Sequence, residues 1–342
     1  MAEIKPNYDT KRKKLAEIIP LAAPFTVYIE QTKYCNFKCF YCIHSTRDEA
    51  DGEFRALGHR MQHIDEGFFE KIIHDLKAFP QGGIKRIVFS GLGEPLMNPR
   101  LPDYVRMAVE AGIARRVEVI TNGLLLTPEK SKALVEAGIT NINISVQGLD
   151  AEGYQQTCGV RIDFDHYLEN LKYLYEHKGN VQIYIKAIDA TLKTKENEEK
   201  FFRIFSPFAD RIYIEHLVVM QQQMDGLREI VDGTKNFYGE ELDVNRKVCA
   251  QSFYFMQIGC EGDIFPCPVP GLGRNLSMGN AKEHTLVEIW NGSRRRGFLR
   301  KMLKKEKDQI PDCATCTCFN AINNPMEQLD DDAERLLPLF ED

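Results

Sequence analysis

The sequence predicts an α/β fold: an open, partial (β/α)6 barrel of the TIM-like type, followed by a small cysteine-rich C-terminal extension. Six short apolar, β-branched segments recur along the chain, helical patterns lie between them, and this alternation stops after about residue 225. Strands that alternate with helices favour a parallel sheet with right-handed crossovers. We therefore expect an N-terminal extension over 1–24, the barrel over 25–225, and the cysteine-rich domain with the C-terminal tail over 226–342.

The elements of the barrel are identified by residue periodicity. Apolar residues of 68–79 fall on one helical face, Thr127-Pro128-Glu129 has Pro at a first helical position, and Gly138 stands where a helix ends. In a barrel of this kind, functional residues lie in the loops at the C-terminal ends of the strands. The six predicted strands are Phe25–Glu30, Ile84–Ser90, Val117–Thr121, Ile142–Val146, Val181–Lys186 and Ile212–Glu215.

The C-terminal part of the chain has a different pattern. Residues 249–318 hold six of the ten cysteines. A hairpin is expected from Phe253–Gly259 to Ile264–Cys267, and an amphipathic helix over Thr285–Leu303. The basic runs of that helix are interpreted as a solvated face, and the tail around Asp330–Asp332 as a surface segment.

Composition excludes several classes of protein. The 342 residues are 43% hydrophobic, and the formal net charge of −6 argues against nucleic acid as the main partner. No apolar stretch is long enough to span a membrane, and the N-terminus lacks the features of a signal peptide. Ten cysteines in such a chain indicate metal ligation rather than disulfides, so we expect a reducing cytoplasm.

The most informative motif is a C-x3-C-x2-C run formed by Cys35, Cys39 and Cys42, which follows the first predicted strand. Three thiolates at this spacing can bind three irons of a [4Fe–4S] cube and leave the fourth iron open for chemistry. The alternatives are a zinc site or three unrelated thiols. Zinc prefers paired CxxC knuckles with four ligands, and His44 is too close to Cys42 to complete such a site.

This run, with Tyr41 before the last cysteine, resembles the signature of the radical S-adenosylmethionine (radical SAM) superfamily. Its members bind SAM on the open iron and reduce it to a 5′-deoxyadenosyl radical, which removes a hydrogen atom from the substrate. The resemblance implies a catalytic [4Fe–4S] cluster, SAM, and an external one-electron reductant such as flavodoxin or ferredoxin. It also implies a partial barrel and places Tyr41 among the cofactor-binding residues.

The glycine-rich turn Ser90–Pro95 follows the second predicted strand. Taken alone, it is equally a tight connection between a strand and a helix. At this position Leu92-Gly93-Glu94 resembles the family's GGE motif, whose backbone carbonyls and carboxylate receive the ammonium group of SAM. The resemblance thus implies that Gly93 and Glu94 bind the cofactor.

Three further residues are candidates for SAM contacts. Asn122 ends the third predicted strand, where it is alternatively a left-handed turn residue, and Ser145 ends the fourth, where the family's counterpart binds the ribose or carboxylate. Many relatives place an arginine for the SAM carboxylate shortly beyond that strand. Cys158 occupies that position here, and Arg161, three residues on, is the candidate for the role.

The C-terminal cysteines predict a second metal site. Seventeen residues separate Cys249 from Cys267, and a CxxC formed by Cys313 and Cys316 follows. Spacing alone suits a closed [4Fe–4S] cluster and a four-cysteine zinc site equally. The segment resembles the SPASM/twitch extension of radical SAM enzymes, which implies an auxiliary [4Fe–4S] cluster. Cys260 and Cys318 are left over, and either is a possible replacement ligand.

The predicted function is that of a radical SAM oxidoreductase or epimerase that acts on a sugar-like or other small polar molecule. The cysteine spacing resembles that of a twitch dehydrogenase acting on an aminocyclitol. The main alternative is maturation of a ribosomally made peptide, although only 34 residues precede Cys35 and relatives often carry a recognition domain there. A non-catalytic iron–sulfur or zinc scaffold is a remote third reading.

Cys158 is the candidate catalytic residue, expected in a loop at the barrel mouth. A thiol there can quench a carbon radical by giving up its hydrogen atom, which would make the enzyme an epimerase. The alternative is that Cys158 is a small, semi-buried hydrophobe.

Overall fold

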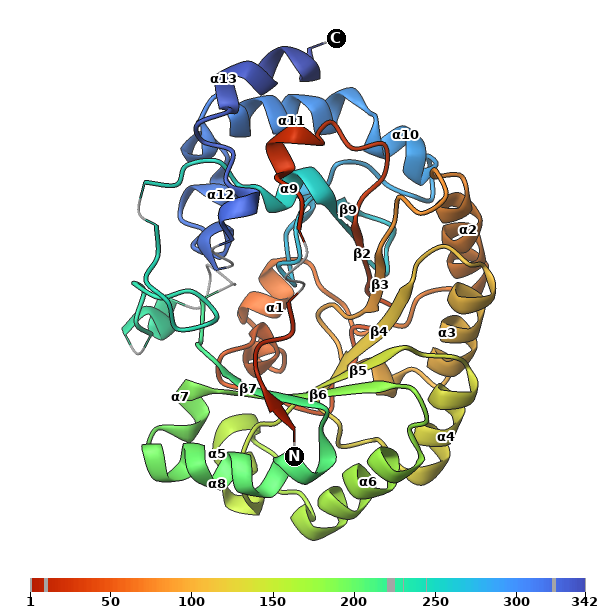
Figure 1. The fold of residues 1–342 in the computed structure, drawn as a ribbon, viewed down its shortest axis with the longest axis vertical. Helices are drawn as coiled ribbons and strands as arrows, with labels where there is room; N and C mark the ends of the chain where they lie inside the picture. The colour runs from red at the N-terminus through yellow and green to blue at the C-terminus, as the bar shows by residue number, and fades with distance from the viewer. Residues whose placement is uncertain are drawn as a thin grey trace.

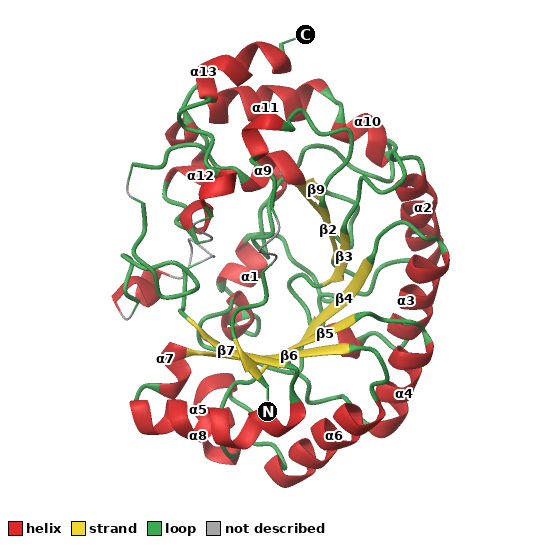
Figure 2. Ribbon diagram, viewed as in Figure 1, coloured by secondary structure: helices red, strands yellow, loops and turns green. Residues whose placement is uncertain are grey.

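The computed structural model describes residues 2–8, 12–219, 225–229, 231–243, 245–321 and 324–341. Its centre is a nine-stranded open sheet in the order β1-β7-β6-β5-β4-β3-β2-β8-β9. All neighbouring strands are parallel except β8 and β9, which are antiparallel. The sheet curves without closing, and its convex side is covered by helices (Figures 1 and 2).

The bounds of the elements are as follows. The strands are β1 (Glu3–Ile4), β2 (Thr26–Ile29), β3 (Arg86–Phe89), β4 (Arg116–Thr121), β5 (Asn141–Ser145), β6 (Gln182–Ile188), β7 (Arg211–Glu215), β8 (Phe255–Ile258) and β9 (Ile264–Phe265). The helices are α1 (Glu53–Ala56), α2 (Glu66–Lys77), α3 (Leu101–Glu110), α4 (Pro128–Glu136), α5 (Ala151–Cys158), α6 (Phe164–His177), α7 (Asp189–Leu192), α8 (Lys195–Phe205), α9 (Gln251–Tyr254), α10 (Leu286–Trp290), α11 (Ser293–Leu303), α12 (Pro311–Ala314) and α13 (Ala333–Leu336).

The predicted partial barrel is confirmed, with β2 to β7 as its six strands. Successive side chains of a strand point to opposite faces. On the convex face, residues such as Ile29, Phe89 and Ile144 are fully buried and belong to one apolar core with α2, α3, α4, α6 and α8. The other, concave face carries polar residues, and the strand ends on that face position the site described below.

Two strand pairings at the edges of the sheet were not predicted from the sequence. β1 pairs with β7, so the N-terminal segment forms one edge of the sheet. The predicted hairpin is present as β8 and β9, but β8 also pairs with β2, so the hairpin extends the same sheet. A two-residue strand has no periodicity to detect, and its pairing is determined by the free edge of β7.

A second apolar core joins the two ends of the chain. Leu15 and Ile19 pack in it with Phe253, Leu336 and Phe340. The prediction that the tail is a surface segment is therefore only partly correct. Its aspartates are polar, but Leu336 and Phe340 close by are buried, with exposed fractions of 0% and 5%.

The predicted helix over 285–303 is divided into α10 and α11 at Gly292. Thr285 and Glu288 form a capping box that begins α10. The prediction that the basic residues form a solvated face is also only partly correct. Arg295 is buried, its guanidinium lies 3.4 Å from the centre of the Trp290 ring, and it donates hydrogen bonds to backbone carbonyls, including that of Phe253.

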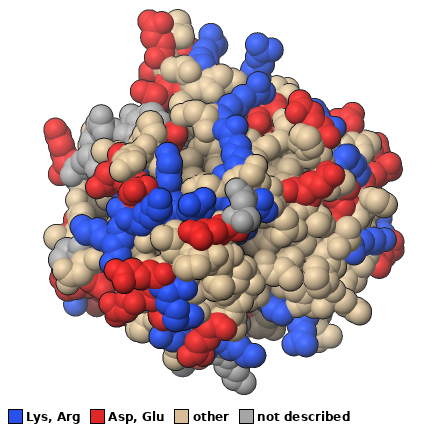
Figure 3. Space-filling view, turned by 90° about the horizontal axis from the view of Figure 1, so that it is seen from above, with Lys and Arg blue, Asp and Glu red and all other residues tan. Residues whose placement is uncertain are grey.

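The surface carries both signs of charge. On the face seen from above, Lys and Arg side chains alternate with Asp and Glu, so no field of a single sign covers it (Figure 3). Among the described residues, no helix combines the length and the apolar character needed to cross a membrane.

Candidate active site

The three-cysteine loop follows β2 and is fixed to α5 by backbone hydrogen bonds. The amide of Lys38 donates to the carbonyl of Cys158 (2.9 Å), and that of Phe40 to Thr157 (3.0 Å). Arg47 Nη1 donates to the carbonyl of Cys35 at 2.7 Å from the other side. These contacts hold a loop without regular secondary structure in one conformation at the C-terminal end of the sheet.

The loop brings Cys35, Cys39 and Cys42 together in a desolvated environment. Burial, and to a lesser degree the neighbouring Cys39, raises the pKa of Cys42 to about 12. Burial is also the largest cause of the raised pKa of Cys35, to which Cys39 and Cys42 add. Three half-buried thiols that disfavour one another's ionisation need a positively charged partner to become thiolates, and an iron–sulfur cluster supplies that charge.

The arrangement does not suit a single ion. Among the described residues, no three His, Cys, Asp or Glu side chains are grouped closely enough to hold one metal ion. The three thiolates that hold a [4Fe–4S] cube can lie farther apart than the ligands of one ion, because each thiolate binds a different iron. The donor set therefore fits the predicted cluster.

The glycine-rich turn packs directly on this loop. A Cβ added to Gly93 would lie 2.4 Å from the carbonyl oxygen of Thr32 and 2.7 Å from that of Tyr34, so only glycine fits. The amide of Glu94 donates to Tyr34 at 2.8 Å. The predicted cofactor residue Gly93 thus lies against the backbone that leads into Cys35.

Glu94 is buried and hydrogen-bonded to neighbouring groups. Its carboxylate accepts from Thr121 Oγ1 (2.6 Å) and from the amides of Asn122 (2.7 Å) and Leu96 (2.9 Å). Burial raises its pKa, and these donors oppose that effect. A carboxylate has about four acceptor positions, so one remains for a further donor such as an ammonium group.

Asn122 and Tyr41 also lie at this end of the sheet. Asn122 Nδ2 donates to Asn36 Oδ1 in the cluster loop (2.7 Å), and its φ is not positive, which excludes the left-handed turn reading. Tyr41 donates to Gln147 Oε1, and Gln147 Nε2 donates to the carbonyl of Ser145 at 3.1 Å. Ser145 is half-buried at the end of β5, so the structure gathers these candidates around the loop.

Arg161 is placed less favourably than the others. It is exposed beyond the end of α5, and no ion pair or hydrogen bond of its side chain is found within the described part of the chain. Its contact with the SAM carboxylate stays a prediction.

Cys158 does not lie in a loop, contrary to expectation. It is the last residue of α5, and its side chain is fully buried. A hydrogen bond with the Cys158 thiol is the largest cause of the raised pKa of Cys39, ahead of burial. Cys158 therefore lies against a predicted cluster ligand, and its role as a hydrogen-atom donor stays a prediction.

A separate cavity, with about 680 Å³ of empty space that is partly open to solvent, lies in the C-terminal part of the fold. Burial raises the pKa of Cys249 to about 11 and that of Cys313 to about 12, so these thiols need a bound metal to become thiolates at neutral pH. Five cysteines line this cavity: Cys249, Cys267, Cys313, Cys316 and Cys318.

The two cysteines without an assigned cluster, Cys260 and Cys318, lie in different surroundings. Cys318 lines the cavity together with the four predicted ligands, so it is available as a replacement for one of them. Cys260 lies at the turn between β8 and β9, where its thiol donates to the carbonyl of Glu30 at 3.0 Å. Sequence spacing alone could not distinguish these two residues.

The concave face of the sheet carries a polar cluster on β6 and β7. Lys186 Nζ donates to Glu215 Oε2 at 2.5 Å, and Tyr184 OH to Glu215 Oε1 at 3.0 Å. With exposed fractions of 25% and 14%, the side chains of Lys186 and Glu215 are not ordinary surface charges. The alternation of polar and apolar residues along β6 is the signal for this face.

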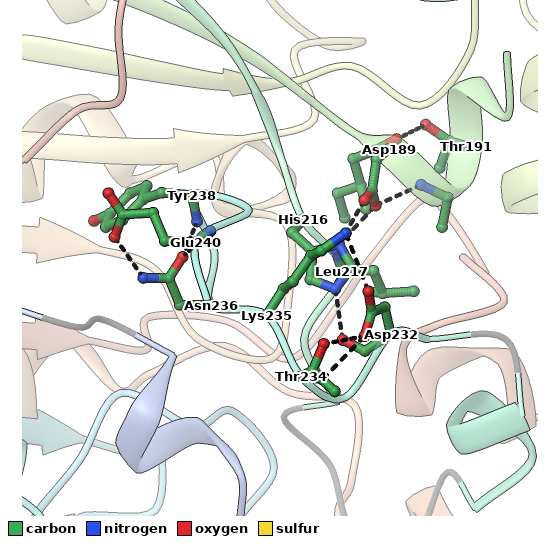
Figure 4. A network of polar contacts seen from close by, with 12 residues as sticks. Asp189, Thr191, His216, Leu217, Asp232, Thr234, Lys235, Asn236, Tyr238 and Glu240 are labelled. Atoms are coloured by element: carbon green, nitrogen blue, oxygen red, sulfur yellow. Dashed lines mark hydrogen bonds and ion pairs between the residues drawn. The ribbon is translucent and has the colours of Figure 1, made fainter. Parts of the chain in front are cut away.

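Sequence reasoning also missed Asp189 and His216, which follow β6 and β7. His216 Nδ1 lies 2.5 Å from Asp189 Oδ2, and His216 Nε2 lies 2.9 Å from the carbonyl oxygen of Asp232 (Figure 4). The pair fastens the segment around Asp232 to the rim of the barrel.

Comparison with known proteins gives two family matches. A model of the radical SAM superfamily matches residues 29–205, and a model of the SPASM iron–sulfur cluster-binding domain matches residues 249–317. The first match covers more than half of the chain.

Similar curated proteins include the tungsten-containing aldehyde ferredoxin oxidoreductase cofactor-modifying protein of Pyrococcus furiosus, 24% identical over 86% of this chain and 88% of the relative. The PqqA peptide cyclase of Streptomyces rochei is 25% identical over 87% of this chain and 85% of the relative.

Two solved structures share the fold. BtrN in complex with AdoMet and 2-DOIA has a TM-score of 0.55 at 18% identity, covering 85% of this chain and 92% of that one. SuiB of Streptococcus suis bound to S-adenosylmethionine has a TM-score of 0.59 at 19% identity, covering 90% and 74%.

Proposed function

Because the chain belongs to the radical SAM superfamily and carries a SPASM domain, we propose that it oxidises a small, polar, hydroxyl-bearing molecule at a C–H bond. The catalytic [4Fe–4S] cluster and SAM supply a 5′-deoxyadenosyl radical, and the SPASM domain supplies an iron–sulfur centre able to accept an electron. The substrate class and the type of reaction are proposed from the side chains that this chain presents to a substrate.

The observation that carries the proposal is the polar concave face of the sheet. Tyr184 and Lys186, in the middle of β6, form a hydrogen-bonded group on that face with Glu215, which lies at the C-terminal end of β7. Barrels of this class bind substrates at that end. Closely spaced donors and acceptors of both charges suit a small molecule with several hydroxyl or amino groups.

These residues can also take part in the oxidation itself. Oxidation of a carbinol removes a hydrogen atom, an electron and a proton, so the site needs a proton acceptor. Glu215 is a carboxylate on this face, and Tyr184 and Lys186 hold it in one orientation. The likeness to BtrN, which was solved with 2-DOIA, supports a small-molecule substrate.

Peptide maturation is the second candidate. It is favoured by the similarity to a PqqA peptide cyclase over 87% of this chain and by the fold shared with SuiB, which was solved with its precursor peptide SuiA. Epimerisation with Cys158 as hydrogen-atom donor belongs to either substrate class.

The test is substrate-dependent cleavage of SAM under anaerobic conditions with a chemical reductant. A polyol or amino sugar should increase the formation of 5′-deoxyadenosine and yield a ketone or aldehyde that has lost two hydrogens. Stimulation by a peptide alone would replace the proposal by peptide maturation. A product of unchanged mass that takes up solvent deuterium would indicate epimerisation.

A further inference from the structure

Lys307 is a buried lysine in the wall of the cysteine-lined cavity. It is 8% exposed, and it lines the cavity together with the predicted cluster ligands Cys249, Cys267, Cys313 and Cys316. Lysine is rarely buried, because its ammonium group loses hydration unless other groups replace the water. The partners of this ammonium therefore indicate what the charge does.

The turn after α11 determines where Lys307 lies. Lys305 has a φ of 61°, the left-handed conformation in which many helices end. Two backbone hydrogen bonds of 2.9 Å, from the amide of Glu306 to Lys301 and from that of Lys305 to Met302, complete a Schellman motif. The chain then enters a short 3-10 helix that begins at Lys307 and contacts α12. The side chain of its first residue is thereby placed beside the CxxC segment.

The Lys307 ammonium binds the backbone of that segment. Nζ donates hydrogen bonds to the carbonyl oxygens of Cys313 and, at 3.1 Å, of Ala314. It also lies 4.7 Å from the centre of the Phe319 ring. Two carbonyl oxygens and a ring face are suitable partners for a cation, since an ammonium has three donors and no acceptor. A positive charge is thus fixed on the peptide that carries a predicted cluster ligand.

The acidic groups near this ammonium are more exposed to solvent than Lys307 is. Apart from the cysteines, Lys307 and Asp312 are the charged side chains among the described residues that line the cavity. Asp312 is half-buried, and its Oδ2 accepts a hydrogen bond from Asn275 Nδ2 at 2.8 Å. Asp308 Oδ1 lies 3.8 Å from Lys307 Nζ, but the Asp308 side chain is 85% exposed, so water screens its charge. The least screened of these charges at the cavity is therefore positive.

A fixed positive charge changes the redox behaviour of a cluster beside it. A cluster held by four thiolates is negatively charged, and it becomes more negative when it takes up an electron. A nearby cation stabilises the reduced state more than the oxidised state and so raises the reduction potential. We propose that Lys307 tunes the auxiliary iron–sulfur centre: its ammonium fixes the CxxC segment and raises the potential at which the centre accepts an electron. This role is independent of the substrate class and so goes beyond the proposed function.

The experiment is a redox titration of the anaerobically purified holoenzyme, followed by electron paramagnetic resonance. Cys249→Ala identifies the auxiliary signal, because that variant should lack it. Lys307→Gln keeps hydrogen-bond donors for the two carbonyls but removes the charge. Its auxiliary midpoint potential should fall by about 59 mV, which corresponds to a tenfold change in the equilibrium constant for one electron. A unit charge about 10 Å away, at an effective dielectric constant of about 20, has an effect of this order.

Three further variants isolate the effect of the charge. Lys307→Arg keeps the charge and should titrate close to the wild type. Lys304→Gln removes an exposed lysine at the end of α11 and should leave the auxiliary potential unchanged. Asp312→Asn removes the acidic charge from the cavity wall and should shift the auxiliary potential upward, opposite to Lys307→Gln. The signal of the catalytic cluster should keep its potential in all of these variants.

Iron content separates a structural role of Lys307 from an electrostatic one. The proposal is overturned if Lys307→Gln keeps about eight irons per chain and its auxiliary signal titrates as in the wild type. Loss of about four irons in both Lys307→Gln and Lys307→Arg would also overturn it, since the shape of the side chain rather than its charge would then hold the segment. Loss of iron in Lys307→Gln alone, with Lys307→Arg unchanged, would support the proposal, because the centre would then need the charge itself.

Discussion

Replacement of Gly93 by Ala tests the packing on which the whole cofactor site depends. The new Cβ would lie 2.4 Å from the carbonyl oxygen of Thr32, whereas real contacts of this kind essentially never fall below 3.0 Å. One of the two backbones must then move by at least 0.6 Å, the difference between these distances. Neither contact atom belongs to a flexible side chain, so the strain cannot be relieved cheaply.

The expected cost is about 1–3 kcal/mol, as for other overpacked sites. Because the displaced backbone leads into Cys35, SAM binding should weaken about tenfold or more, the equivalent of about 1.4 kcal/mol. Equilibrium dialysis of SAM and anaerobic thermal unfolding would measure the two effects on the same preparation.

Gly67→Ala is the matched control. Gly67 lies inside α2, and an added Cβ meets only Asp65 Oδ1 at 3.5 Å, an ordinary contact. Alanine is a better helix former than glycine by about 0.5–1 kcal/mol, so this variant should be at least as stable as the wild type. If Gly93→Ala bound SAM normally and unfolded like the wild type, the close packing of the two loops would be refuted.

Three further predictions concern individual side chains. Cys35→Ala and Cys249→Ala should each remove about four of about eight irons per chain. Cys260→Ala should leave the iron content unchanged, because the Cys260 thiol is hydrogen-bonded to Glu30. Equal iron loss in all three variants would contradict the assignment. Glu94→Gln should weaken SAM binding and lower stability by about 1–3 kcal/mol, since its amide cannot accept all three hydrogen bonds, which calorimetry and dialysis would show. Cys158→Ala should still form 5′-deoxyadenosine; loss of an inverted product in that variant would instead identify Cys158 as the hydrogen-atom donor.

The sequence predicted the structure correctly where residues close together in the chain determine it. The six barrel strands follow from β-branched runs, and α4 begins at the expected Thr127-Pro128. The cluster cysteines and Glu94 follow from short motifs, whose geometry is set within a few residues.

Contacts between distant parts of the chain could not be predicted in this way. Burial of Cys158 depends on the packing of α5 against the cluster loop, and the separation of Cys318 from Cys260 depends on how the hairpin joins β2. The pairing of Lys33 with Glu261 joins residues 228 positions apart. No local pattern encodes such a contact.

The central claim is that this enzyme removes a hydrogen atom from a small, hydroxyl-bearing molecule. The most direct measurement is the mass of the 5′-deoxyadenosine formed from SAM in the presence of a perdeuterated polyol or amino sugar. The account predicts transfer of a single deuterium to 5′-deoxyadenosine in the wild type and none in Cys35→Ala. Unlabelled 5′-deoxyadenosine with every such molecule, together with deuterium transfer from a labelled peptide, would contradict it.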